Sequence, residues 1–238
     1  MQRVRVRAAP SVAVAIGATL VALACALAIG PARAAPDTAD LDAIRAASPP
    51  CPPAAAHCVG LVVHVAPSMD GGFVQTPAWI AAQLATANRL FAPLGLGFTV
   101  DEVRALGDRE RTIMTRRERS RLGARLRKRG RIDVFVVGRL GDVDDTERDL
   151  NGVHWRRGAA HWVILSARAW DLTLGHELGH YLGLPHSDVA ASIMNTTRRS
   201  EPPPEQRAFQ PDELARMTRV LRRSLRTKAL RDRVATDR

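Results

Sequence analysis

The pattern of apolar residues along the chain predicts five β-strands. Two of them are continuous apolar runs, typical of central strands buried on both faces. Two are short β-branched or alternating runs, the first of which is ended by Pro67. The fifth alternates, with Val153 and Trp155 on one side, as an edge strand does. In chain order these segments are 59–67, 98–103, 132–138, 152–157 and 161–167.

Between these strands the apolar spacing changes to that of helices. Thr76 and Pro77 are a typical N-cap and first-turn proline, and Ile80, Leu84, Ala87 and Phe91 follow at helical intervals. Residues 115–129 predict a strongly basic outer helix that is largely solvated, because its apolar face holds only Leu122 and Leu126.

Two more helices follow along the chain. One starts after residue 170, with Asp171 as its expected N-cap, and a final basic helix starts near Pro211, from Gln210 or Asp212. Strands separated by helices predict an α+β (α/β) fold in which helices cover a mixed, twisted β-sheet.

The first 34 residues have the layout of a secretory signal peptide. Arginines precede the apolar run SVAVAIGATLVALACALAIG, and the small-residue site at Ala32 and Ala34 predicts cleavage after Ala34. A retained membrane anchor is the competing interpretation, because the run approaches the ~20 residues that span a bilayer. Lipidation at Cys25 is disfavoured, because VALA is a poor match to a lipoprotein signal. The first two interpretations both place the rest of the chain outside the cytoplasm, secreted or periplasmic.

The remaining chain divides into three parts. Residues 35–57 are rich in Ala, Pro and Asp and are expected to be a linker or short pro-segment, with order beginning near Cys58. Residues 58–225 form the predicted domain, and residues 226–238 a basic tail that frays. In an exported chain, Cys51 and Cys58 favour a disulfide. The alternative, a cysteine that caps a latent metal site, lacks a supporting motif.

The net charge of the chain limits the classes of binding partner that we expect. The formal net charge of the 238 residues is +11, and the first 34 residues contribute four arginines and no acid, which leaves +7. A basic surface attracts nucleic acid, anionic lipid or acidic polymers. No nucleic-acid module is visible, so we expect no nucleic-acid partner, no stable membrane partner unless the N-terminal segment is retained, and a monomer kept soluble by self-repulsion. The acidic loop 141–152 does not match EF-hand spacing, so calcium has no support.

The strongest chemical signal is the stretch LTLGHELGHYLGLPHS at 172–187. His176 and His180 are four residues apart, so on a helix both project from one face and can reach one cation at ~2.0–2.1 Å. Glu177 borders that face without being needed as a ligand, which leaves it free to accept a proton. We read His57, His64, His154 and His161, which lie outside such a pattern, as structural.

His186 supplies a third imidazole. A continuous helix would carry residue 186 ~600° past residue 180, away from the ligand face. Gly183 removes this obstacle, because glycine adopts the left-handed conformation that ends helices, and Pro185 discourages continuation. Three histidines with one open position are the donor set of a catalytic rather than a structural zinc site.

Residues 176–186 fit every fixed position of His-Glu-x-x-His-x-x-Gly-x-x-His, and the chain thereby resembles the metzincin metalloproteases. The resemblance implies a zincin-like catalytic domain with an active-site helix and a smaller C-terminal subdomain carrying a terminal helix. It implies one Zn²⁺ bound by His176, His180 and His186, Glu177 as general base, and a Met-turn at Met194. Ser187 resembles the matrixins, whereas SIMN at 192–195 resembles the pappalysins.

The implied function is a secreted zinc endopeptidase acting on protein or peptide substrates. The resemblance suggests that substrate pairs with an edge strand, for which Gly152, Val153, His154 and Trp155 are the candidates. Two alternatives are an exported zinc-binding protein without turnover and a zinc amidase acting on cell-wall peptides. The only tyrosine, Tyr181, lies inside the predicted zinc helix, so a tyrosine near the Met-turn is missing.

Overall fold

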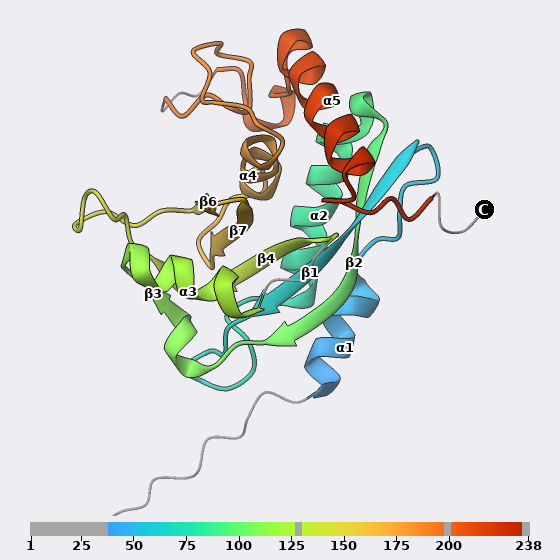
Figure 1. The fold of residues 1–238 in the computed structure, drawn as a ribbon. Coiled ribbons are helices and arrows are strands. Elements are labelled where there is room, and N and C mark those ends of the chain that lie inside the picture. Colours follow the sequence, from blue (N-terminus) through green and yellow to red (C-terminus); the bar gives the residue numbers. More distant parts are fainter. Residues whose placement is uncertain (1–37, 127–129, 198–200, 235–238) are drawn as a thin grey trace, which may run out of the picture. The chain divides into compact units, whose positions relative to one another are not determined.

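A computed structural model describes residues 38–126, 130–197 and 201–234 (Figure 1). The predicted signal peptide at 1–34, including Cys25, lies outside these residues. None of the helices described is both long and apolar enough to cross a membrane.

The fold is built on a five-stranded mixed sheet with the strand order β2-β1-β4-β7-β6. All neighbours are parallel except β6, which runs antiparallel to β7 and forms one edge. The strands are β1 (His57–Val65), β2 (Leu96–Ala105), β4 (Ile132–Val137), β6 (Gly152–Arg157) and β7 (Ala160–Ser166). A two-stranded parallel ribbon pairs β3 (Thr112–Ile113) with β5 (Arg139–Leu140).

Alternating side chains of the central strands supply two cores, one on each face of the sheet. In β4, Val134 and Val136 join the larger core, whereas Phe135 and Val137 join the smaller one. Strand β4 is buried throughout, and its sequence is apolar at every position except Asp133. The Asp133 carboxylate is hydrogen-bonded to the His64 ring at 2.8 Å. The continuous run at 132–138 therefore predicted this central strand correctly.

Four helices border the larger core: α1 (Thr38–Ala47), α2 (Pro77–Phe91), α4 (Thr173–Tyr181) and α5 (Pro211–Arg226) (Figure 1). The smaller core is covered by α3 (Arg116–Leu126). Short 3₁₀ turns complete the described fold at Ala92–Leu94, Asp108–Arg111 and Pro204–Gln206. As predicted, Thr76 caps α2 by accepting the Trp79 N–H, and Gln210 opens α5 in a reciprocal cap with Glu213.

Both ends of the predicted domain need correction. Order does not begin near Cys58, because α1 lies within the supposed linker and the Ile44 side chain is fully buried. Nor does the tail fray from residue 226 onward: Leu230 is buried, and Asp232 bonds the His57 ring at 2.6 Å beside β1. These segments are ordered by apolar and charged contacts with strands far away in the sequence, and such contacts cannot be predicted from local composition. A disulfide joins Cys51 to Cys58.

The basic helix α3 is less solvated than predicted. Arg119 is 2% exposed and donates to the Gly141 carbonyl at 2.6 Å, and its guanidinium lies 5.0 Å from the Trp155 ring centre. Leu122 is buried in the smaller core. The helix thus packs against β6, and Arg116, Arg117 and Arg121 are exposed.

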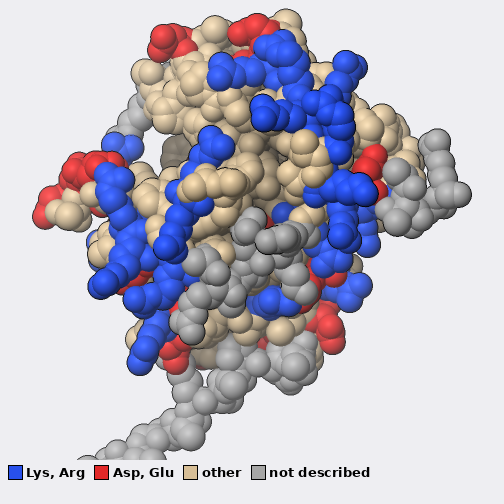
Figure 2. All heavy atoms as spheres, in the orientation of Figure 1, with Lys and Arg blue, Asp and Glu red and all other residues tan. Residues whose placement is uncertain are grey.

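Arginines and lysines gather on the visible surface with few acidic groups among them (Figure 2). On α5 the exposed basic residues are Arg216, Arg219, Arg222, Arg223 and Arg226. Part of the acidic loop before β6 is paired with arginines: Asp149 pairs with Arg139 at 2.9 Å and Asp142 with Arg148 at 3.9 Å.

Candidate metal centre

Helix α4 and the turn that ends it bring three histidines together. His176 and His180 lie one turn apart on α4, and Gly183 follows with φ +89°. In this left-handed turn the Leu184 N–H bonds to the Gly179 carbonyl and the Gly183 N–H to the His180 carbonyl, each at 3.0 Å. This pair of bonds is the Schellman pattern of a glycine-terminated helix. The reversal brings His186 back to the other two rings.

The three rings converge tightly enough to share one ion. Ligand nitrogens of His176, His180 and His186 all lie within 4.8 Å of one another. Their ring centres are 4.7, 4.8 and 5.5 Å apart. Within the described ranges this is the one such group of potential metal-ligating residues, and it holds three ligands rather than the four of a closed structural site.

Backbone hydrogen bonds orient two of the rings for metal binding. The Nδ1 of His176 donates to the Ile193 carbonyl at 2.7 Å, and the Nδ1 of His180 donates to the Leu184 carbonyl at 2.7 Å. With the proton held at Nδ1, the Nε2 lone pair is free to face a cation. Burial lowers the pKa of His176 to about 4 and also lowers that of His180, so both rings are neutral, as ligands must be.

Glu177 is buried beside this group. The residue is 5% exposed, and burial raises the pKa of its carboxyl to about 8, against the lowering effects of the His154 backbone N–H and the Arg119 charge. A carboxyl poised near neutrality can both accept and return a proton. A divalent cation at the histidines would favour its ionised form.

The segment 192–195 forms a turn under α4. Met194 is fully buried, its N–H donates to the Ser192 hydroxyl at 2.9 Å, and its carbonyl accepts the Ser187 N–H at 3.1 Å. The same hydroxyl donates to Glu213 on α5 at 2.7 Å. The turn therefore ties α5 to the chain that carries His186, and its Ile193 carbonyl orients His176.

Strand β6 borders the metal centre along one side. A Cβ on Gly152 would stand 2.7 Å from the Thr173 Cγ2 and 3.0 Å from the Glu177 Cγ, so only glycine lets the strand approach so closely. The predicted edge strand at 152–157 is indeed the sheet edge, and it brings the His154 backbone to Glu177.

Three aromatic side chains form a cluster beside β6 that the sequence did not reveal. His154 and His161 are hydrogen-bonded at 2.9 Å, and His161 stacks on Tyr181 with ring centres 3.8 Å apart. The residues come from two strands and a helix, and only strand pairing brings them together. The Tyr181 ring is thus packed against the sheet side of α4.

The start of α4 differs from the prediction. Asp171 is exposed and does not cap the helix; the N-cap is Leu172, whose side chain makes no capping bond. Instead, the Leu174 N–H donates to Gln83 of α2 at 3.1 Å. Gln83 lies in the interior of α2, and nothing in the local sequence indicates that it caps a helix so far along the chain.

The matrixin family model of metallopeptidases matches residues 144–219, a segment that contains β6, β7, all three histidines and the Met194 turn. This segment of the chain is similar to the metallopeptidases of that family. Of the two subfamily patterns in the sequence, the matching model is the matrixin one. The metzincin-like assignment agrees with the histidine cluster and with zinc as its metal.

Two solved structures are similar to this chain at low sequence identity. Metalloproteinase-II from Bacteroides fragilis is 14% identical with a TM-score of 0.48, covering 72% of this chain and 55% of its own. Archaemetzincin from Methanopyrus kandleri is 15% identical with a TM-score of 0.48, covering 69% of this chain and 96% of its own. The chain thus spans little more than half the length of the Bacteroides protein. No curated protein matches it significantly.

Proposed function

We propose that the protein is an exported zinc-dependent endopeptidase in which Glu177 is the general base. One observation carries the proposal: three convergent imidazoles lie beside a buried carboxyl, that of Glu177, which is not part of the ligand group. His176, His180 and His186 would hold the ion. Zinc bound by three neutral imidazoles acidifies water and polarises a carbonyl as a Lewis acid.

Proton transfer would then be carried out by Glu177. Glu177 accepts a proton from the attacking water and delivers it to the leaving amine, so that one carboxyl serves as base and then as acid. Contact with Gly152 and the His154 backbone N–H holds this carboxyl at the edge of β6. A fixed carboxyl loses little entropy on reaching the reactive geometry.

Substrate would bind along β6. The strand pairs only with β7 in the described sheet, so an extended peptide could pair with its outer edge. Its proximity to Glu177 would bring the scissile bond of such a peptide to the metal centre.

Export is supported by the N-terminal apolar run and by the Cys51–Cys58 disulfide, since disulfides persist in oxidising compartments. Fractionation of cells producing the full chain tests this part. A signal peptide predicts a product that begins at Ala35, whereas a retained anchor predicts a full-length, membrane-bound product.

Digestion of casein and of a peptide library, with and without a chelator, tests the activity. We expect internal cleavage that the chelator abolishes and added zinc restores. Stoichiometric zinc without peptide cleavage would instead favour a zinc-binding protein that lacks turnover. Cleavage confined to peptidoglycan fragments would favour the cell-wall amidase.

A further inference from the structure

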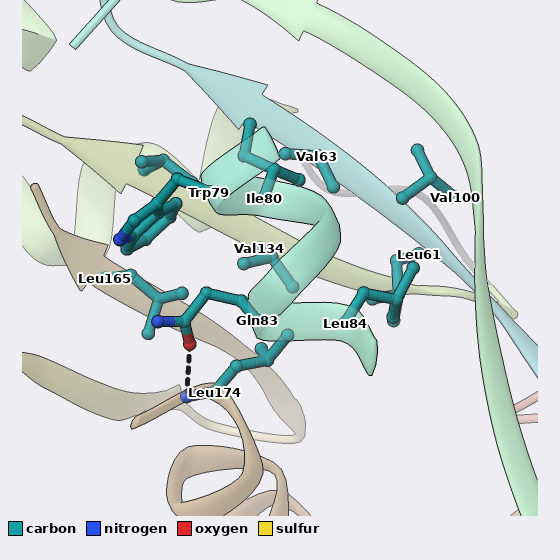
Figure 3. Close-up of a pocket in the computed structure, with 11 residues that line it drawn as sticks. Leu61, Val63, Trp79, Ile80, Gln83, Leu84, Val100, Val134, Leu165 and Leu174 are labelled. Atoms are coloured by element: carbon teal, nitrogen blue, oxygen red, sulfur yellow. Dashed lines mark hydrogen bonds between the residues drawn. The ribbon is translucent and has the colours of Figure 1, made fainter. Parts of the chain in front are cut away.

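The first turn of α4 depends on a residue from another helix. The leading N–H groups of a helix have no partner inside it and must be satisfied from elsewhere. Leu172 offers no polar side chain at the N-cap, and the Leu174 N–H is satisfied by Gln83 instead. Figure 3 shows Gln83 reaching from α2 to this turn, with the bond to Leu174 drawn as a dashed line.

Both ends of the Gln83 amide are used. Its nitrogen donates to the Trp170 carbonyl at 2.8 Å, while its oxygen accepts the Leu174 N–H. The side chain therefore bridges the loop that enters α4 and the first turn of the helix. Gln83 is 1% exposed, so the two backbone groups it contacts are shielded from solvent on this side.

Water is a poor substitute for this amide. The cavity beside Gln83 measures about 10 Å³, and its other lining residues are apolar. A cavity of that size is at the lower limit for holding one water molecule, and a water needs several polar partners. The capping bond is thus specific to a side chain of this length and polarity.

We propose that Gln83 is a positioning residue of the metal centre, which holds the start of α4 and thereby the placement of His176 and Glu177. Leu174 precedes His176 by two residues and Glu177 by three, so a displaced first turn would move both. The inference rests on the proposed metallopeptidase function, but zinc affinity reports on it independently of turnover.

A matched control lies on the same helix. Asn88 is also a buried amide of α2, and it bonds both backbone groups of Phe98 in β2, at 2.7 and 3.1 Å. Gln83→Met and Asn88→Leu each replace a bridging amide by an apolar side chain of similar size. Only the first of these changes touches the zinc-binding helix.

The experiment compares zinc dissociation constants, kcat and KM for these two variants with those of the native chain. We expect Gln83→Met to weaken zinc binding by about tenfold, the scale of outer-shell substitutions, and to lower kcat more than it changes KM. Asn88→Leu should lower the melting temperature of the metal-free protein and leave zinc affinity unchanged. Equal zinc affinity in Gln83→Met and the native chain, or equal losses in both variants, would overturn the proposal.

Two further measurements keep the test decisive if Gln83→Met does not fold. Burial keeps the carboxyl of Gln83→Glu protonated, so that one oxygen can accept the Leu174 N–H while the other donates to the Trp170 carbonyl, and this variant should bind zinc nearly as tightly as the native chain. In the unsubstituted protein, the Leu174 amide hydrogen should exchange slowly. Weak zinc binding by Gln83→Glu, or rapid exchange at Leu174, would count against the cap. If the native chain binds zinc but cleaves nothing, the peptidase proposal fails, while the affinity comparison still decides the role of Gln83.

Discussion

Met194 lies directly beneath Gly179 of α4: a Cβ on residue 179 would stand 2.6 Å from the Met194 sulfur and 3.0 Å from the Phe209 ring. Helix α4 and the turn at 192–195 are therefore packed without room for a methyl group. Since the same turn supplies the Ile193 carbonyl that orients His176, close packing here and ligand orientation are linked.

Gly179→Ala should destabilise the protein by about 1–3 kcal/mol, the usual cost of overpacking a well-filled core. Chemical denaturation measures this loss. The double variant Gly179→Ala with Met194→Ala should lose less than the sum of the two single changes, because removing the sulfur makes room for the new methyl group. Strict additivity would show that the two residues do not limit each other.

Glu177→Gln should lower kcat/KM by about 10²–10⁴-fold, the range for loss of a general base. The substitution preserves size beside Gly152 and removes the proton acceptor, so zinc content and melting temperature should stay near native values. Peptide-cleavage kinetics and metal analysis on the same sample provide the check. Cleavage at the native rate would refute the assignment of the base.

Removal of zinc should lower the melting temperature, because a ligand that binds only the folded state stabilises it. With free zinc at about 100 times its dissociation constant, the gain is about 2.7 kcal/mol. Thermal unfolding with chelator, with zinc and with zinc in His186→Ala measures this increment. A zinc-dependent gain that persists undiminished in His186→Ala would exclude residue 186 as a ligand.

Acid should destabilise the fold through His154. Burial first, and then the nearby His161, lower the folded-state pKa of His154 to about 3 from the ordinary 6.5. The unfolded chain therefore takes up this proton first, and the contribution of His154 is complete above about pH 6.5 and is lost as pH falls towards 3. The free energy of unfolding should fall less steeply with acid in His154→Gln, measured with zinc present throughout. Identical slopes in the two proteins would contradict the shift.

A chain that ends at Arg226 should be less stable by roughly 2 kcal/mol, because it loses the buried Leu230 side chain. It also loses the bond between Asp232 and His57. Its zinc affinity should be native, since the tail contacts β1 and Gly130 rather than α4. Unchanged stability on truncation would restore the original prediction of a frayed tail.

Local pattern was sufficient for much of the sheet and for the spacing of the histidines. Continuous apolar runs identified β4 and β7, and alternation identified β6, because burial of strand faces leaves a direct record in residue order. Likewise, the four-residue interval between His176 and His180 and the glycine at 183 describe geometry that neighbouring residues create among themselves.

What the sequence by itself determined, then, is the set of elements and a candidate metal site within one helix and the turn that follows it. Only the tertiary structure decided that Gln83 rather than Asp171 caps that helix, that β6 closes against Glu177, that Arg119 is buried, and that α1 and the tail join the fold. These relationships join residues far apart in the chain. They depend on packing across the sheet, and they cannot be predicted from helical or strand periodicity, which reflects only local burial.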